Sequence, residues 1–147
     1  MSELDAIRTG LESSCRELVR TLEKTPDDKG GYKPTPTCNS TLEVLKHVVG
    51  ANEWFAHFIV TGEAVFPPPE VVFPDSLSPA RERLKEAHGK LLSALDTLTA
   101  EQLDDTEEMP WGETETKREL WNYMAGHYMW HAGQVAYIQT ALGIMDY

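Results

Sequence analysis

Basic residues are few in this chain: 13 lysines and arginines stand against 24 acidic residues among 147, so the formal net charge is -11. A surface of this sign repels phosphate backbones, which argues against nucleic acid as a partner. The sequence also lacks a basic segment followed by an apolar one at its start, and no apolar run approaches the length of a membrane span. We therefore expect a cytoplasmic protein that works with neither nucleic acid nor membrane.

Cysteine is equally scarce. Cys15 falls on the apolar stripe of a predicted helix, and Cys38 lies in a loop rich in proline and threonine. Two unrelated thiols in a reducing compartment fit this placement better than one disulfide does. The two cysteines therefore indicate neither a disulfide framework nor a zinc motif.

Four segments repeat apolar residues with helical period, and they cover about residues 2–24, 41–61, 78–98 and 116–143. Ser40 with Glu43 and Thr116 with Glu119 have the spacing of capping boxes. Ser78, followed by a proline suited to the first helical position, is the expected cap of the third helix. The chain is predicted to be all-α, a four-helix bundle that forms a single domain over residues 1–147.

Three loops separate the predicted helices. The loop over residues 63–77 contains four prolines, and its piece Val71–Phe73 has the character of a strand without a clear partner. The loop over residues 101–115 is expected to hold a short helical turn and then irregular chain. Their lengths predict at least one long crossover connection between helices.

Two histidines lie four residues apart on the last predicted helix. At 100° per residue, His131, Gln134 and the apolar Met124 all fall within about 60° of His127. On the second helix, Val44, Ala51, Trp54 and Phe58 likewise surround His47. Three buried imidazoles need partners, because an unpaired buried polar group costs about 1–3 kcal/mol. One metal ion bound by His47, His127 and His131 would remove that cost and leave an open coordination position.

Two further side chains are candidates for a role beside the metal. Glu43 lies one turn before His47, at about 40° from it, and would serve as base or ligand support, although we favour its capping role. Gln134 lies one turn after the last histidine and either orients a ligand or bonds the backbone of a facing helix. His88 also faces inward, as a fourth ligand, a supporting group or, more simply, a hydrogen-bonded core histidine. His57 is interpreted as a boundary or surface residue.

Aromatic residues are interpreted mainly as core and cavity wall; they are Trp54, Phe58, Tyr123 and Trp130. Trp111, just before the last helix, would either shape the site entrance or, as we prefer, close the bundle end. The second helix is apolar on its other faces too, which fits packing on more than one side, either within the core or in a dimer contact.

The stretches "EVLKHVVGANEWF" and "TKRELWNYMAGHYMWHAGQVAYIQTALG" resemble the DinB/YfiT-like superfamily, above all in H-x-x-x-H-x-G-Q. The resemblance covers nearly the whole chain. It implies a bundle in up-down-down-up order that is commonly a homodimer. It also implies a divalent metal, often zinc or nickel, held by three histidines that match His47, His127 and His131. Several relatives use a low-molecular-weight thiol as transferases or isomerases.

These observations predict a metal-binding protein that acts as an enzyme on a small molecule. The open position of a three-histidine site would activate water, as in a hydrolase, or a thiol, as in an S-transferase. A metal- or ligand-binding bundle without catalysis is the alternative, and a bundle without metal is a third.

Overall fold

The structure is a computed structural model that describes residues 1–65, 70 and 72–144. Four helices make up most of it: α1 (Glu3–Glu23), α2 (Thr41–Thr61), α3 (Leu77–Leu95) and α4 (Lys117–Ala141). Two short 3-10 helices, η1 (Asp27–Lys29) and η2 (Glu101–Asp104), and a hairpin of β1 (Thr106–Glu108) and β2 (Thr114–Thr116) lie in the connections. The predicted four-helix bundle is confirmed.

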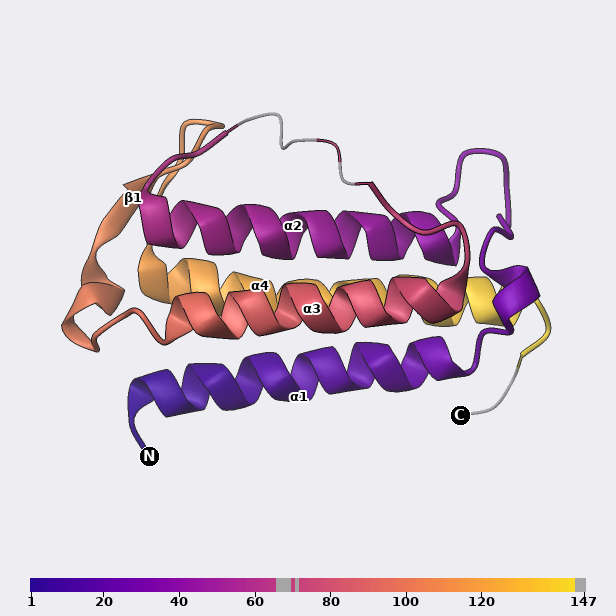
Figure 1. Ribbon diagram of the computed structural model, residues 1–147, viewed down its shortest axis with the longest axis horizontal. Coiled ribbons are helices and arrows are strands. Elements are labelled where there is room, and N and C mark those ends of the chain that lie inside the picture. Colours follow the sequence, from indigo (N-terminus) through magenta and orange to yellow (C-terminus); the bar gives the residue numbers. More distant parts are fainter. Residues whose placement is uncertain (66–69, 71, 145–147) are drawn as a thin grey trace.

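The helices run in up-down-down-up order. In Figure 1, α1 and α4 run in one direction, while α2 and α3 both start at the opposite end and run back. Helix α2 packs most extensively on α3, and α1 on α4, whereas α2 and α4 share fewer contacts. Because α2 and α3 are parallel, the chain between them must return along the bundle, which confirms the predicted crossover. Of the proposed strand at residues 71–73, residue 71 lies outside the described residues, and Val72 and Phe73 are irregular chain.

Side-chain caps set where three of the helices begin. Both predicted capping boxes form, at Ser40 and at Thr116, and a third forms at Ser2. The predicted start of α3 at Ser78 is wrong, because Ser76 holds the cap position with an extended backbone. The earlier start brings Leu77, which has no exposed surface, into the core on the first turn of the helix.

The segment before α4 is more regular than its sequence indicated. The predicted helical turn is confirmed as η2, but the chain that follows is a β-hairpin rather than irregular. Its strands pair antiparallel, with Thr106 opposite Thr116 and Glu108 opposite Thr114. Strands made only of threonine and glutamate show no apolar alternation, which is why the periodicity did not reveal them. Gly112, at a φ of 92°, turns the chain between them.

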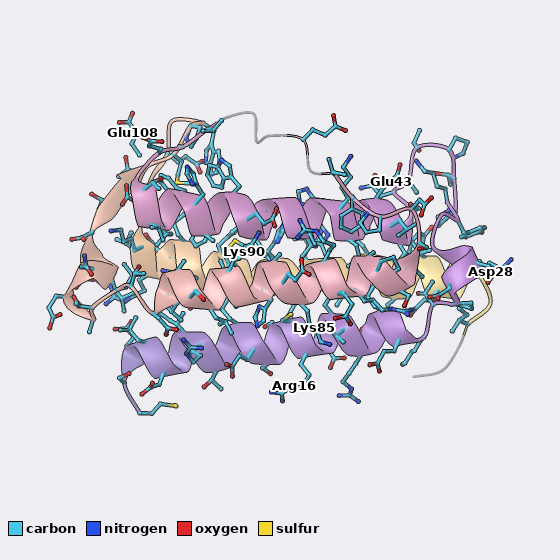
Figure 2. The ribbon with its side chains drawn as sticks, in the orientation of Figure 1. Arg16, Asp28, Glu43, Lys85, Lys90 and Glu108 are labelled. Carbon is cyan, nitrogen blue, oxygen red and sulfur yellow. The ribbon has the colours of Figure 1, made fainter. Side chains whose placement is uncertain are left out.

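The apolar stripes of the four helices meet in one core, while charged side chains such as Arg16, Asp28 and Lys85 project outward (Figure 2). At its centre, the Trp121 ring meets the Phe55 ring edge-on at 5.0 Å. No helix in the described part of the chain combines the length and apolar character that a membrane crossing needs.

The apolar residues on the other faces of α2 belong mainly to the core, with Val60 exposed, and most of the exposed apolar surface of the helices lies on α4. On α2, Leu45 and Val49 are fully buried within the bundle. On α4, in contrast, four large side chains are about half exposed or more, and they are Tyr123, Met129, Trp130 and Tyr137. Tyr123 nevertheless lines the cavity described below, as a wall residue should, whereas the interpretation of Trp130 as core or wall is wrong because it is 72% exposed. Trp54 and Phe58 stack at 5.3 Å and do belong to the core and its wall.

Candidate metal centre

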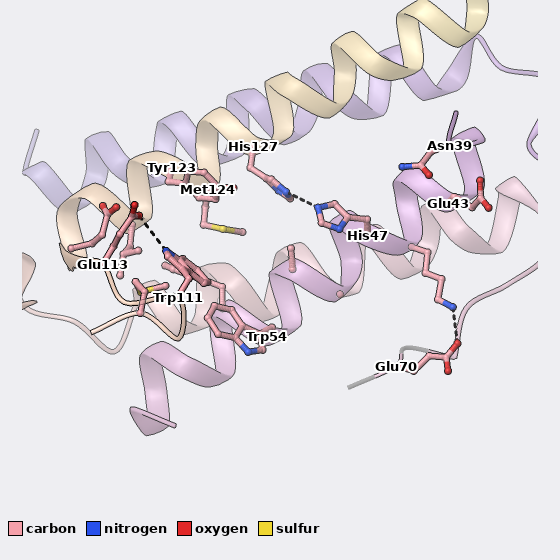
Figure 3. A pocket seen from close by; sticks show the side chains of 17 residues that line it. Asn39, Glu43, His47, Trp54, Glu70, Trp111, Glu113, Tyr123, Met124 and His127 are labelled. Carbon is pink, nitrogen blue, oxygen red and sulfur yellow. Dashed lines mark hydrogen bonds and ion pairs between the residues drawn. The ribbon is translucent and has the colours of Figure 1, made fainter. Parts of the chain in front are cut away.

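Three histidines from two helices converge on one point. The Nε2 atom of His127 lies 3.1 Å from Nε2 of His47 and 3.0 Å from Nε2 of His131. Figure 3 shows the first pair reaching toward each other from α4 and α2. The nitrogen atoms that could bind an ion all lie within 4.8 Å of one another. The structure thus brings together the three residues that the helical geometry selected. We refer to them as the histidine cluster.

The three Nε2 atoms of the cluster face one another, and too few of them carry a proton for all of these contacts to be hydrogen bonds. Gln134 Oε1 lies 2.7 Å from His131 Nδ1. A carboxamide oxygen only accepts, so Nδ1 carries the proton, and Nε2 of the neutral ring presents a lone pair. His127 Nε2 can donate to only one of its two neighbours, and its buried Nδ1 has no hydrogen-bond partner. A cation among the three Nε2 atoms would use these lone pairs together.

The donor set fits a divalent transition metal. Nitrogens that bind zinc at about 2.0–2.1 Å in tetrahedral geometry lie about 3.3 Å apart, close to the distances within the cluster. Imidazole suits zinc, copper, iron and nickel alike. Three such ligands leave one position open, which is the composition of a catalytic rather than a closed structural site.

Burial favours the neutral, metal-binding form of two histidines. It lowers the pKa of His127 to about 4, and the charges of His131 and His47 act in the same direction. It also lowers the pKa of His131, which is 8% exposed. His47 is exposed, so its predicted burial among apolar neighbours is wrong. The reason is that α2 and α4 do not close over it but leave a cavity between them.

This cavity, which we call the main cavity, has a volume of about 780 Å³. His47 and His127 lie in its middle, with Trp54 and Trp111 toward one end and Asn39 toward the other (Figure 3). Trp111 lines the entrance instead of closing the bundle end, contrary to the interpretation we preferred. The hairpin that the sequence did not reveal carries this residue to the site.

Glu43 completes the capping box at the start of α2, where Ser40 is the cap residue. Its Oε2 accepts from the Ser40 backbone N–H at 2.7 Å, and its Oε1 accepts from Lys33 Nζ at 2.6 Å. The Lys33 contact is the main reason that the pKa of Glu43 lies below its ordinary value. The capping interpretation is confirmed. Its role as a base stays a prediction, which these contacts do not favour because both oxygens are engaged.

His88 is a core histidine and not a fourth ligand. Its Nδ1 lies 2.8 Å from the Tyr128 hydroxyl, which also accepts from Asn52 Nδ2 at 2.7 Å and is hydrogen-bonded to the Cys15 thiol. These four residues, one from each helix, form what we call the tyrosine hub. Sequence reasoning missed Asn52 and Tyr128, although a polar asparagine among the buried residues of α2 was an available indication.

The remaining predicted residues lie where expected. His57 is exposed at the surface of α2. Cys15 and Cys38 are both free thiols, which confirms that they form no disulfide. Cys38 accepts a hydrogen bond from Thr35 Oγ1 at 3.0 Å in the loop before α2.

Comparison with known proteins agrees with this architecture. The family described as the DinB superfamily matches residues 11–135. A DinB-like protein from Bacillus subtilis, YjoA, is similar at 27% identity, with 96% of this chain and 94% of that chain covered and a TM-score of 0.76. No curated protein matches the chain.

Two further solved structures share the fold at lower identity. YfiT from Bacillus subtilis, described as "a probable metal-dependent hydrolase with an unusual four-helix bundle topology", is 16% identical, with 99% and 91% of the two chains covered and a TM-score of 0.77. A conserved protein from Enterococcus faecalis is also 16% identical, with 97% and 99% covered and a TM-score of 0.76.

Proposed function

The chain belongs to the DinB superfamily, and from this premise we propose that it is a metal-dependent enzyme of the hydrolase type that acts on a small molecule. The observation that carries the proposal is the meeting of three Nε2 atoms, with distances of 3.0 and 3.1 Å, beside a cavity large enough for a substrate. A purely structural metal site would be closed by a fourth protein ligand. No fourth such residue joins the cluster among the described residues.

The residues of the chain have separate tasks in this proposal. His47, His127 and His131 hold the ion, and Gln134 holds His131 in the tautomer that presents Nε2. A divalent ion, when bound, supplies Lewis acidity and lowers the pKa of a water or thiol in the open position. The apolar wall of the main cavity, which includes Phe55 and Met124, limits access of bulk water to the reacting groups.

Hydrolysis is favoured over thiol transfer as the reaction. YfiT, which shares the fold, carries the description of a hydrolase, whereas the thiol-dependent reaction rests on the sequence resemblance. The same open position would take a low-molecular-weight thiol as thiolate, so the two reactions need a direct comparison. Titration of cobalt-substituted protein with small thiols, followed by the sulfur-to-metal charge-transfer band, separates them. A saturating band would favour the transferase, and its absence alongside ester or amide hydrolysis would favour the hydrolase.

Metal content is the first test of the proposal. Protein purified without a histidine tag and dialysed against zinc or nickel should retain about one ion per chain by elemental analysis. Protein that retains none would contradict the proposal. Retention without any hydrolytic or thiol-dependent reaction would instead support a metal-binding bundle without catalysis.

We also propose that the protein is a homodimer whose contact includes the exposed face of α4. Met129, Trp130 and Tyr137 present large apolar surface there, which monomeric proteins rarely leave in water as one patch. Sedimentation velocity should give the mass of two chains, and Trp130→Asp should shift it toward one. A monomeric wild-type protein would contradict this arrangement.

A further inference from the structure

We propose that the substrate has two halves, an apolar half with a ring and no negative charge that lies against Trp54 and Trp111, and a polar half that extends toward Asn39 and Lys46. This inference rests on the proposed function, since it takes the histidine cluster as the reaction centre. The substrate class is inferred from the main cavity, whose two ends differ in chemistry.

The histidine cluster lies between these two ends. Figure 3 shows Trp54, Trp111 and Met124 on one side of His127 and His47, and Asn39 on the other. A ligand that fills the cavity therefore passes the cluster near its middle. The bond that reacts would be the one that joins the two halves.

The apolar end is built to receive a flat group. The Trp54 ring is held by stacking on Phe58 and by its Nε1, which donates to the Val65 carbonyl at 2.6 Å. The Trp111 ring lies 6.4 Å from the Trp54 ring and is inclined to it by 34°. Met124 lies nearly buried beside them. A ring placed against this wall would remove apolar area from water on both partners.

The turn that carries Trp111 is itself held in place. Backbone N–H groups of Met109 and Gly112 donate to the carbonyls of Glu113 and Met109, at 2.7 and 2.8 Å. The Trp111 side chain remains 54% exposed, and its Nε1 donates to Glu113 Oε2 at 3.3 Å. The indole thus presents a fixed apolar surface that a ligand can cover without first ordering the loop.

The two ends also differ in how their carboxylates are paired. Glu43 and Glu70, at the end near Asn39, form ion pairs with Lys33 and Lys46. Glu113 and Glu115 line the cavity beside the tryptophans, and no ion pair is found for either within the described part of the chain. Lys46 is the one lysine or arginine among the described residues that line the cavity, and its partner Glu70, at 3.1 Å, lies at the end opposite the tryptophans. A carboxylate on the ring would meet like charge, whereas polar groups of the other half find Lys46 and the Asn39 amide.

Hydroxamates test this division, because they bind metal by their head and can carry different tails. The zinc-loaded protein would be titrated by calorimetry with acetohydroxamate, 3-phenylpropanohydroxamate and the derivative of the latter with a carboxylate on the ring. We expect the phenyl probe to bind about tenfold or more tightly than acetohydroxamate. The ring carboxylate should remove most of this gain.

Variants of the protein then show where the phenyl tail of the probe binds. Trp111→Ala should abolish most of the phenyl gain and leave the affinity for acetohydroxamate unchanged, while Trp111→Phe should restore part of it. Val60→Ala is the control, because Val60 is 58% exposed on α2, outside both the main cavity and the exposed face of α4. The double change of Glu113 and Glu115 to glutamine should improve binding of the carboxylate probe selectively.

The outcomes distinguish this inference from the proposal beneath it. Protein that takes up zinc and binds acetohydroxamate, but gains nothing from the ring, would overturn the two-part substrate and leave the metal site standing. Equal loss in the Trp111→Ala and Val60→Ala variants would overturn the placement of the ring. Failure to take up zinc would contradict the proposed function and the inference together.

Discussion

The histidine cluster and the tyrosine hub both place polar side chains inside the helical bundle, yet their chemistry differs. The hub joins complementary groups: the Tyr128 hydroxyl accepts from Asn52 and meets His88 and Cys15, with one residue from each helix. The cluster brings three like atoms together, since each histidine points the same Nε2 at the others. The hub is closed in the core around a fully buried tyrosine, while the cluster opens to the main cavity.

The difference shows how a buried polar group can be assigned to structure or to ligand binding. Donors and acceptors that satisfy one another stabilise and align the helices that carry them. Acceptor atoms that converge with too few protons among them are stabilised only when a cation or another ligand binds between them. The helical pattern placed His88 and the three cluster histidines alike on inward-facing stripes. The direction of a side chain alone therefore could not show which histidines bind metal and which belong to the core.

The largest expected difference between the two regions is in metal uptake. His127→Ala should lose stoichiometric binding of zinc or nickel, because His127 Nε2 contacts both other ligands. His88→Ala should keep about one ion per chain, because it belongs to the hub. Elemental analysis of folded protein, verified by circular dichroism, measures both. Uptake that survives in the first variant, or fails in the second, would show that the ligands are wrongly assigned.

A smaller effect is expected from the residue that supports the cluster. Gln134→Ala should weaken metal affinity about 10- to 100-fold, because His131 Nδ1 loses the acceptor that orients the ring. Competition with a chelating dye would measure the change. Gln134→Glu, which keeps an acceptor at this position, should bind nearly as well as the wild type. If the alanine variant matches the wild type, Gln134 has no positioning role.

The hub should respond in stability rather than in metal binding. Tyr128→Phe should lower the free energy of unfolding by about 1–3 kcal/mol, because buried Asn52 and half-buried His88 lose their shared partner. Its metal content should remain that of the wild type. Tyr137→Phe on the same helix is exposed and should change stability by less than about 0.5 kcal/mol. Urea denaturation that gives the same midpoint for both variants would contradict a structural role for the hub.

The last comparison concerns the pH dependence of stability in metal-free protein. Burial lowers the pKa of His127 from its ordinary value of 6.5 to about 4 and also lowers that of His88. Between these values the unfolded chain binds more protons, so the free energy of unfolding should fall as the pH drops from 6.5 toward 4.

Two variants show how much of this pH dependence comes from the histidine cluster and how much from the tyrosine hub. His127→Gln should flatten the dependence more than His88→Gln, because the His127 pKa is lowered further. Urea denaturation at a series of pH values would measure both. An unchanged slope in His127→Gln would mean that this histidine already titrates normally in the metal-free protein.

Helical periodicity predicted much of the bundle, since the burial of one stripe per helix imposes a period on each segment. The same reasoning selected His127 and His131, because residues four apart on a helix share a face whatever the rest of the fold does. It selected His47 for the right face of α2 but for the wrong degree of burial. Burial depends on how closely α4 approaches, which no single segment encodes.

The sequence by itself determined the helices, their capping boxes and the two ligand positions on α4, because each depends on neighbours within a few residues along the chain. Only the tertiary structure decided what those positions face. The parallel placement of α2 beside α3 leaves a cavity toward α4, and a polar hairpin without apolar period brings Trp111 to its mouth. Likewise, His88 joined Tyr128 rather than the cluster because the packing of four helices, not the pattern of any one, sets which inward groups meet.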